Sequence, residues 1–271
     1  MPAINTNVAA LFAQQSLKVN ERNQSNAMRQ LSTGSRINTA GDDAAGMAIG
    51  QSMTTQVRGL NQAVRNLNDG VNMMQTAEGA LSETSNMLQR MRELAVQSSN
   101  GTYSSTQRDY LNTEFQALSA QITKVSTQTK WNDQSLLTTA TNFVFQAGKD
   151  NTQTITATIA DMGAIGLGIT TVLSVATVTG SALSITALDT AIGTINTQRA
   201  NIGAAINQMT YAVDNLSNVS ANASASRSSI MDTDYATAST QLSKTQIIQQ
   251  AATAMLAQAN QQPQSVLALL K

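Results

Sequence analysis

The sequence predicts a mainly α-helical protein: a long antiparallel coiled-coil or helical-bundle rod with a small β-hairpin region, and terminal helices paired in a second coiled coil. Two long heptad repeats flank a short β-prone middle, and both ends of the chain carry weaker helical patterns. No proline lies between Pro2 and Pro263, so nothing in between must break a helix. Because a helix with one apolar stripe must bury it, we expect these helices to pack lengthwise.

The first long repeat covers residues 53–96. Apolar residues recur at every seventh position, and a second apolar seam beside them gives the 4-3 alternation of a coiled-coil helix. The main seam consists of Met53, Leu60, Leu67, Met74, Leu81, Leu88 and Ala95, and the second of Val57, Val64 and Val71. Asp42 and Asp43 precede the repeat in a glycine-rich loop, where capping of the helix is favoured over Mg²⁺ or Ca²⁺ binding.

A third helix and a hairpin are predicted next along the chain. The turn signal Asn100-Gly101 ends the first long helix, and a new helix begins near Ser104 or Ser105. Its stripe steps by 4 and 3 through Leu111, Phe115, Leu118, Ile122 and Val125, and the short connection favours antiparallel pairing with the long helix. Residues 143–145 and 154–159 are β-prone, and residues 148–151 between them form the expected turn.

The heptad returns after the β-prone middle. Its strict seven-residue steps are Leu188, Ile195, Ile202, Met209, Leu216, Ala223 and Ile230. The last segment, residues 242–271, carries a 4-3 stripe through Ile248, Ala252, Met255, Ala259, Val266 and Leu269. The seam methionines, Met255 included, are interpreted as core filler. The first helix, residues 4–31, is weakly patterned, so we expect the two end helices to fold when they meet each other or other subunits.

Composition excludes several function classes. The chain has no histidine and no cysteine, which removes imidazole bases, thiolate nucleophiles and the common zinc, copper and haem sites, so neither an enzyme nor a cofactor is expected. The 16 basic and 16 acidic residues cancel, so no nucleic-acid partner and no membrane partner are expected. Residues 169–188 are uncharged but rich in Ser, Thr and Gly, and the apolar run at residues 8–13 is too short for a signal peptide.

Several strings resemble bacterial flagellin. They are residues 4–7 (INTN), 31–38 (LSTGSRIN), 42–46 (DDAAG), 88–97 (LQRMRELAVQ), 232–236 (DTDYA), 256–261 (LAQANQ) and 266–271 (VLALLK). The resemblance implies an inner-core domain like D0 from residues 1–42 and 236–271. It also implies a helical rod domain like D1 from residues 43–160 and 186–235, leaving residues 161–185 as an exposed and reduced variable segment.

The resemblance also implies the function. The chain would self-assemble into the extracellular flagellar filament for motility, and would be exported through the type III channel without a cleaved signal peptide. Its partners would be copies of itself, an export chaperone on the C-terminal helix, the filament cap and hook-associated proteins. Inner-core assembly would use Leu11, Ile248, Met255, Val266 and Leu269. A surface with Arg90, Leu94 and Glu114 would serve subunit contact, recognition by an animal innate immune receptor, or both.

Three other classes remain as alternatives at this point. A hook–filament junction protein shares the patterns of the end helices. A secreted, membrane-active translocator with coiled coils would make liposomes leak, whereas a filament subunit would polymerise. An enzyme built on this family would need a metalloprotease-like insert, and that site requires histidine, which the chain lacks.

Overall fold

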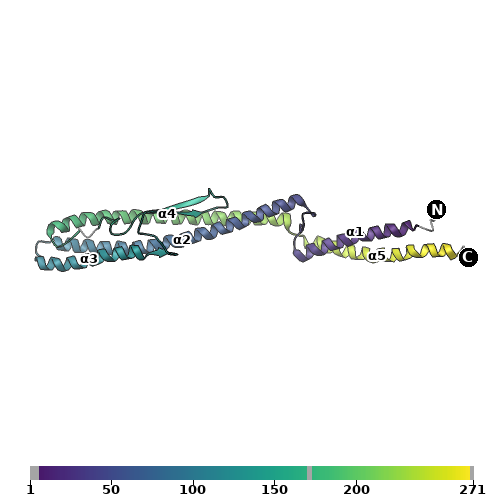
Figure 1. The fold of residues 1–271 in the computed structure, drawn as a ribbon, viewed down its shortest axis with the longest axis horizontal. Helices are drawn as coiled ribbons and strands as arrows, with labels where there is room; N and C mark the ends of the chain where they lie inside the picture. The colour runs from purple at the N-terminus through teal and green to yellow at the C-terminus, as the bar shows by residue number, and fades with distance from the viewer. Residues whose placement is uncertain (1–5, 170–172, 269–271) are drawn as a thin grey trace. The chain divides into compact units, whose positions relative to one another are not determined.

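The computed structural model describes residues 6–169 and 173–268, and it is mainly α-helical, as predicted. Within these residues, five helices and four short strands follow one another (Figure 1): α1 (Val8–Thr33), α2 (Ala44–Ser99), α3 (Ser105–Gln128), β1 (Lys130–Trp131), β2 (Gln134–Ser135), β3 (Thr141–Gln146), β4 (Thr154–Ile159), α4 (Val178–Met231) and α5 (Tyr235–Ala268). They form two compact units. The terminal unit comprises Met1–Thr55 with Asn222–Lys271, and the central unit comprises Gln56–Ala221.

The core of the central unit is a bundle of α2, α3 and α4. Arg199 of α4 pairs with Glu78 of α2 at 2.8 Å, and Asp189 pairs with Arg92 at 2.6 Å, so the two long helices run antiparallel. The predicted heptad residues fill the space between the helices. The buried ones are Leu60, Leu67, Met74, Leu81, Leu88 and Ala95 of α2, Phe115 and Ile122 of α3, and Leu188, Ile195, Ile202 and Met209 of α4.

Local signals fix where α2 and α3 begin. The Asp43 carboxylate accepts the Gly46 N–H at 2.9 Å just as α2 starts, which is the capping role that the sequence favours. Ser104 caps α3 in a reciprocal arrangement: its hydroxyl accepts the Gln107 N–H at 3.3 Å, and the Gln107 side chain accepts the Ser104 N–H at 2.9 Å. Both predicted starts are confirmed.

The predicted hairpin is present as the antiparallel pair β3–β4, in register from Thr141 opposite Ile159 to Gln146 opposite Thr154. Every second residue of β4 is buried in the core, namely Ile155, Ala157 and Ile159. The Gln198 side chain of α4 holds the end of the hairpin, because it donates to the Thr158 carbonyl at 2.9 Å and accepts the Ala160 N–H at 3.3 Å.

The stretch between the hairpin and α4 corrects one expectation. Residues 161–185 were expected to be an exposed remnant, but Met162, Ala164, Leu167, Ile169 and Val175 are buried in the core cluster. The helix α4 also begins at Val178, ahead of the first heptad residue that we identified. The expected exposure is therefore wrong for these five residues, which pack into the central core, whereas Ile165 has an exposed fraction of 81%. Whether the segment varies among relatives stays a prediction.

One helix, α4, contains a window long and apolar enough to cross a membrane when judged by length and composition alone. The heptad stripe of that helix lies in the core of the central unit, where Leu188, Ile195, Ile202 and Met209 are buried. Core helices of soluble proteins meet the same criterion, so this finding adds no support for a membrane role.

Candidate assembly surfaces

The helices α1 and α5 pair antiparallel within the terminal unit and lie side by side in Figure 1. The Asn7 side-chain amide donates to the Ala259 carbonyl at 2.8 Å, and the Asn20 amide donates to the Thr245 carbonyl at 2.7 Å. Asn7 and Asn20 are 13 positions apart, and Ala259 and Thr245 are 14 positions apart, so the two contacts fit one antiparallel register. The predicted pairing of the terminal helices is confirmed.

The contact between α1 and α5 consists of small and polar residues, with two leucines from each helix, at coiled-coil spacing. The residues turned inward on α1 are Ala10, Ala13, Leu17, Asn20, Gln24, Ala27 and Leu31, and those on α5 are Ala238, Leu242, Thr245, Gln249, Ala252, Leu256 and Ala259. Both sets alternate steps of three and four, as knobs in a coiled coil do. Sequence reasoning missed the α1 set because it followed bulky apolar residues; the spacing of the alanines was the available signal.

The bulky apolar residues of the pair face outward, which corrects the predicted stripe on α5. The exposed fractions are 56% for Leu11 and 66% for Met255, and Ile248 is exposed as well. The predicted Ala252 and Ala259 do lie in the seam of α5, but Gln249 and Leu256 occupy the places assigned to Ile248 and Met255, so the interpretation of Met255 as core filler is wrong. Leu269 and the side chain of Val266 lie outside the described residues.

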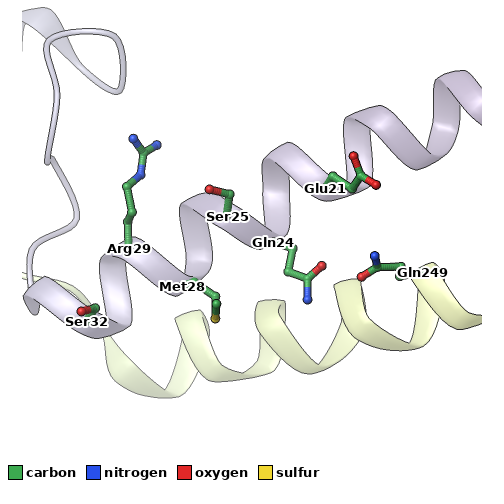
Figure 2. Close-up of a pocket in the computed structure, with 7 residues that line it drawn as sticks. All are labelled: Glu21, Gln24, Ser25, Met28, Arg29, Ser32 and Gln249. Carbon is green, nitrogen blue, oxygen red and sulfur yellow. The ribbon is translucent and has the colours of Figure 1, made fainter.

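These exposed residues form what we call the outer apolar set. It consists of Val8, Leu11, Phe12, Val19 and Met28 on α1, and Ile247, Ile248 and Met255 on α5. A groove of about 840 Å³ runs beside part of it, lined by Glu21, Gln24, Ser25, Met28, Arg29 and Ser32 of α1 and by Gln249 of α5. In Figure 2 the Met28 thioether extends toward α5, and it is the one bulky apolar side chain among polar ones.

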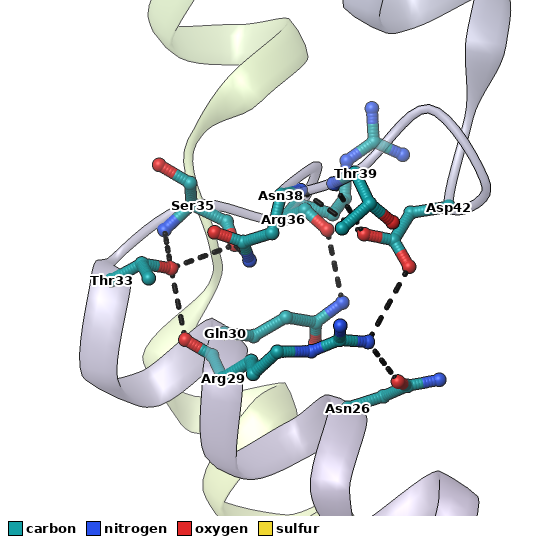
Figure 3. A network of polar contacts seen from close by, with 9 residues as sticks. All are labelled: Asn26, Arg29, Gln30, Thr33, Ser35, Arg36, Asn38, Thr39 and Asp42. Atoms are coloured by element: carbon teal, nitrogen blue, oxygen red, sulfur yellow. Dashed lines mark hydrogen bonds and ion pairs between the residues drawn. The ribbon is translucent and has the colours of Figure 1, made fainter.

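The connector between α1 and α2 is folded by a polar network (Figure 3). Gly34 ends α1 with φ +71°, a left-handed conformation that glycine adopts without strain, and its N–H donates to the Gln30 carbonyl at 2.9 Å. The Asp42 carboxylate accepts the N–H groups of Thr39 and Asn38 at 2.9 and 3.1 Å, and Arg29 lies 3.9 Å away. These hydrogen bonds lower the pKa of Asp42.

The second connector, between α4 and α5, is tied to the first. The Arg36 guanidinium donates to the Ile230 carbonyl at 2.7 Å, and the Thr233 N–H donates to the Gly34 carbonyl at 2.9 Å. Asp234 then starts α5, because its carboxylate accepts the Thr237 hydroxyl at 2.8 Å and the Ala236 N–H at 2.9 Å. These bonds lower the pKa of Asp234, with the Thr237 hydroxyl as the largest cause.

The predicted surface on the central unit is only partly a surface. Arg90 of α2 bridges Glu114 of α3 at 2.9 Å and Glu93 at 3.1 Å, and these partners raise the pKa of Arg90. Leu94, however, has no exposed area. Its assignment to the surface is wrong, because α2 packs against two helices, which buries a third heptad row that includes Met73 and Leu94.

Carboxylates do not gather into a metal site anywhere in residues 6–169 and 173–268, where no group of three or more potential ligands is found. The exposed carboxylates described above cap helices or pair with arginines. What the described residues offer instead is exposed helix faces.

Comparison with known proteins identifies the family. The model of the bacterial flagellin N-terminal helical region matches residues 4–142, and that of the C-terminal helical region matches residues 185–270. The chain belongs to the flagellin family. Flagellin of Halalkalibacterium halodurans is 42% identical over 99% of both chains, and flagellin of Bacillus subtilis is 40% identical over 99% of both. This flagellin is therefore a structural subunit of the bacterial flagellar filament outside the cell, and it is not an enzyme.

Solved structures agree with the assignment. The crystal structure of Bacillus cereus flagellin is 33% identical, with a TM-score of 0.51, and covers 56% of this chain and 88% of its own. A putative flagellar hook-associated protein from Vibrio parahaemolyticus has a TM-score of 0.61 over 70% of this chain but is only 12% identical, so it shows the fold alone. The hook–filament junction alternative is thus the less supported one, and the family assignment supports copies of this flagellin as its partners in the filament.

Proposed function

We propose that the outer apolar set of the terminal unit is the surface through which neighbouring flagellin subunits hold one another in the filament. The observation that carries the proposal is the inversion of the α1–α5 pair. Small and polar residues share its seam with four half-buried leucines, while Phe12, with an exposed fraction of 69%, and Met255 face outward. Monomeric proteins rarely leave such apolar surface uncovered, and its burial would drive association.

Covering the outer apolar set is expected to contribute more free energy than the contacts that hold one α1–α5 pair together. Full burial of one Phe, Leu or Met side chain contributes roughly 1.5–3 kcal/mol. Several residues of the outer apolar set, covered on each subunit, would therefore outweigh the entropy lost when a subunit joins the polymer. Within the subunit, the seam buries mainly alanine, asparagine and threonine, which contribute much less.

The proposal is tested with Phe12→Ser and with Gln14→Ser as a matched control, since both positions are exposed on α1 and both changes introduce the same residue. We expect Phe12→Ser to raise the critical concentration for polymerisation, measured by sedimentation and electron microscopy after salting out, and Gln14→Ser to leave it unchanged. Equal polymerisation of the two variants would refute the proposal.

Deletion of residues 264–271 should leave a soluble subunit that forms no filaments.

We further propose that the Arg90–Glu114 pair lies at a lateral contact between subunits, and that the same surface is what an animal innate immune receptor recognises. Its support is the partial exposure of both side chains at the boundary of α2 and α3. The double exchange Arg90→Glu with Glu114→Arg keeps an ion pair within the subunit. If neighbouring subunits contact this surface, the exchange should weaken polymerisation, and if a receptor contacts it, the exchange should weaken receptor signalling. If both polymerisation and signalling are unchanged, the Arg90–Glu114 pair takes part in neither contact.

Export and capping complete the proposal. We infer that the chain leaves the cell by type III export without a cleaved signal peptide, that a chaperone covers α5, and that the filament cap and hook-associated proteins meet the assembled subunits. The exposed apolar residues Ile247, Ile248 and Met255 support chaperone binding to α5. N-terminal sequencing of secreted protein tests the first point, and loss of chaperone binding in Ile247→Ser tests the second.

A further inference from the structure

Two methionines stand apart from the others in this flagellin. Among the described residues, Met28 and Met255 are exposed, with exposed fractions of 56% and 66%, whereas every other methionine is buried or half-buried. Both exposed methionines lie in the terminal unit, one on each helix of the α1–α5 pair. The chain has no cysteine, so methionine thioethers are its only sulfur atoms.

The position of Met255 connects it with the proposed contact surface. Asn7 contacts Ala259, and Leu11 lies four positions after Asn7 just as Met255 lies four positions before Ala259. Because the helices are antiparallel, Leu11 and Met255 lie at the same level of the pair. Met28 lies in the groove of Figure 2, where its neighbours are polar.

We propose that Met28 and Met255 are oxidation sites at which hydrogen peroxide lowers the ability of the subunit to assemble. The thioether sulfur attacks one peroxide oxygen and the O–O bond breaks, which gives the sulfoxide and, after proton transfer, one water. The sulfur loses two electrons and the peroxide gains them. Exposure selects these two positions, since the central-core methionines such as Met74 have no exposed area.

The effect on assembly rests on the proposed function of the outer apolar set. A sulfoxide is polar, so a surface that must be desolvated on assembly loses part of its driving force. The α1–α5 pair itself should remain folded, because neither methionine is buried in its seam: Met255 faces outward, and Met28, although it extends toward α5, is 56% exposed at the edge of the contact. Oxidation would therefore block the contact between subunits and leave the subunit intact.

The test uses the purified full-length subunit, treated with hydrogen peroxide until peptide mass spectrometry shows sulfoxide at both sites. We expect the critical concentration for polymerisation to rise roughly tenfold, as expected for loss of part of the burial of one or two side chains. Helix content by circular dichroism should stay constant, and methionine sulfoxide reductases should restore polymerisation.

Two variants separate this mechanism from general damage. Met28→Leu with Met255→Leu keeps the apolar volume but cannot form a sulfoxide, so it should polymerise normally after peroxide. Met74→Leu changes a buried methionine and should remain as sensitive as the parent. The inference is overturned if the fully oxidised parent polymerises normally, if the double variant is equally sensitive, or if oxidation unfolds the helices.

A final measurement separates the inference from the function on which it rests. In assembled filaments, the outer apolar set is expected to be covered, so Met255 should oxidise more slowly than in the free subunit. Equal rates in both states would refute the proposed contact surface while leaving the chemistry of oxidation intact. Protection in filaments without any effect of the sulfoxide on polymerisation would refute only the inference.

Discussion

Asn20 provides the sharpest test of how the terminal helices find their register. Its exposed fraction is 5%, and its side-chain amide donates to the carbonyl of the buried Thr245 at 2.7 Å. In coiled coils, a polar residue at a seam position specifies alignment at a cost in stability. We therefore expect the stability of the pair to fall when the amide is simply removed and to rise when a large apolar side chain replaces it.

Asn20→Ala removes the hydrogen bond and adds no apolar contact of similar size. The net contribution of such a bond is about 0.5–1.5 kcal/mol. Backbone amides of α1 and α5 should then exchange with solvent about twofold to tenfold faster, because local opening of the pair becomes easier. Hydrogen-exchange mass spectrometry on the subunit measures this change, with amides of α3 as the internal reference.

Asn20→Leu should stabilise the pair but loosen its alignment. Burial of a leucine contributes roughly 1.5–3 kcal/mol, more than the lost hydrogen bond, while the directional contact is gone. Since the chain has no cysteine, introduced pairs report the register. Ala13→Cys with Ala252→Cys should cross-link in the native alignment, and Ala13→Cys with Ala259→Cys only after a shift of one heptad.

The reasoning fails under either of two results. If Asn20→Ala leaves amide exchange in both helices unchanged, the hydrogen bond to Thr245 does not stabilise the pair. If Asn20→Leu gives only the native cross-link, as the parent does, Asn20 is not needed for register and the contact of Asn7 with Ala259 is sufficient.

Three further predictions concern the other parts of the molecule. Leu88→Ala should destabilise the central unit by about 2–5 kcal/mol in urea unfolding, while the same change at its exposed neighbour Gln89 should have little effect. Ser104→Ala should cost about 0.5–2 kcal/mol, seen as a lower thermal midpoint, because α3 loses its reciprocal cap. The lowered pKa of Asp42 implies a contribution to stability that is present above its ordinary value of 3.8 and is lost as pH falls through the lowered value. Asp42→Asn should flatten that part of the pH profile of unfolding, and an unchanged profile would contradict this role.

The central unit could be predicted well from the sequence because its helices bury large side chains. The heptads of leucine, isoleucine and methionine in α2 and α4 indicate helices that bury one stripe in a core. The alternation in β4 indicates a strand with one buried face. The turn signals at Asn100-Gly101 and at residues 148–151 then fixed the connections. Leu94 was misplaced because a heptad shows which residues face one partner, and α2 has two.

The terminal unit was harder to predict because its inward and outward residues are reversed relative to the usual pattern. Hydrophobic periodicity assumes that bulky apolar residues mark the buried face. In α1 and α5, Leu11, Phe12 and Met255 are exposed, and alanine and amide residues are turned inward. A single sequence does not reveal what covers the outward side chains, so the stripe on α5 was wrong at Ile248 and Met255, although it was right at Ala252 and Ala259.

Because the seam of the terminal pair contains many small residues, the cost of pulling α1 and α5 apart should differ between a free subunit and the polymer. When α1 and α5 of a lone subunit come apart, the apolar burial that is lost belongs to alanines and to half-buried leucines of the seam, and the outward side chains lose none. Once copies cover the outward side chains, the same separation would also strip Phe12 and Met255 from their neighbours. One pair of helices would thus separate more readily in the free subunit than in the polymer.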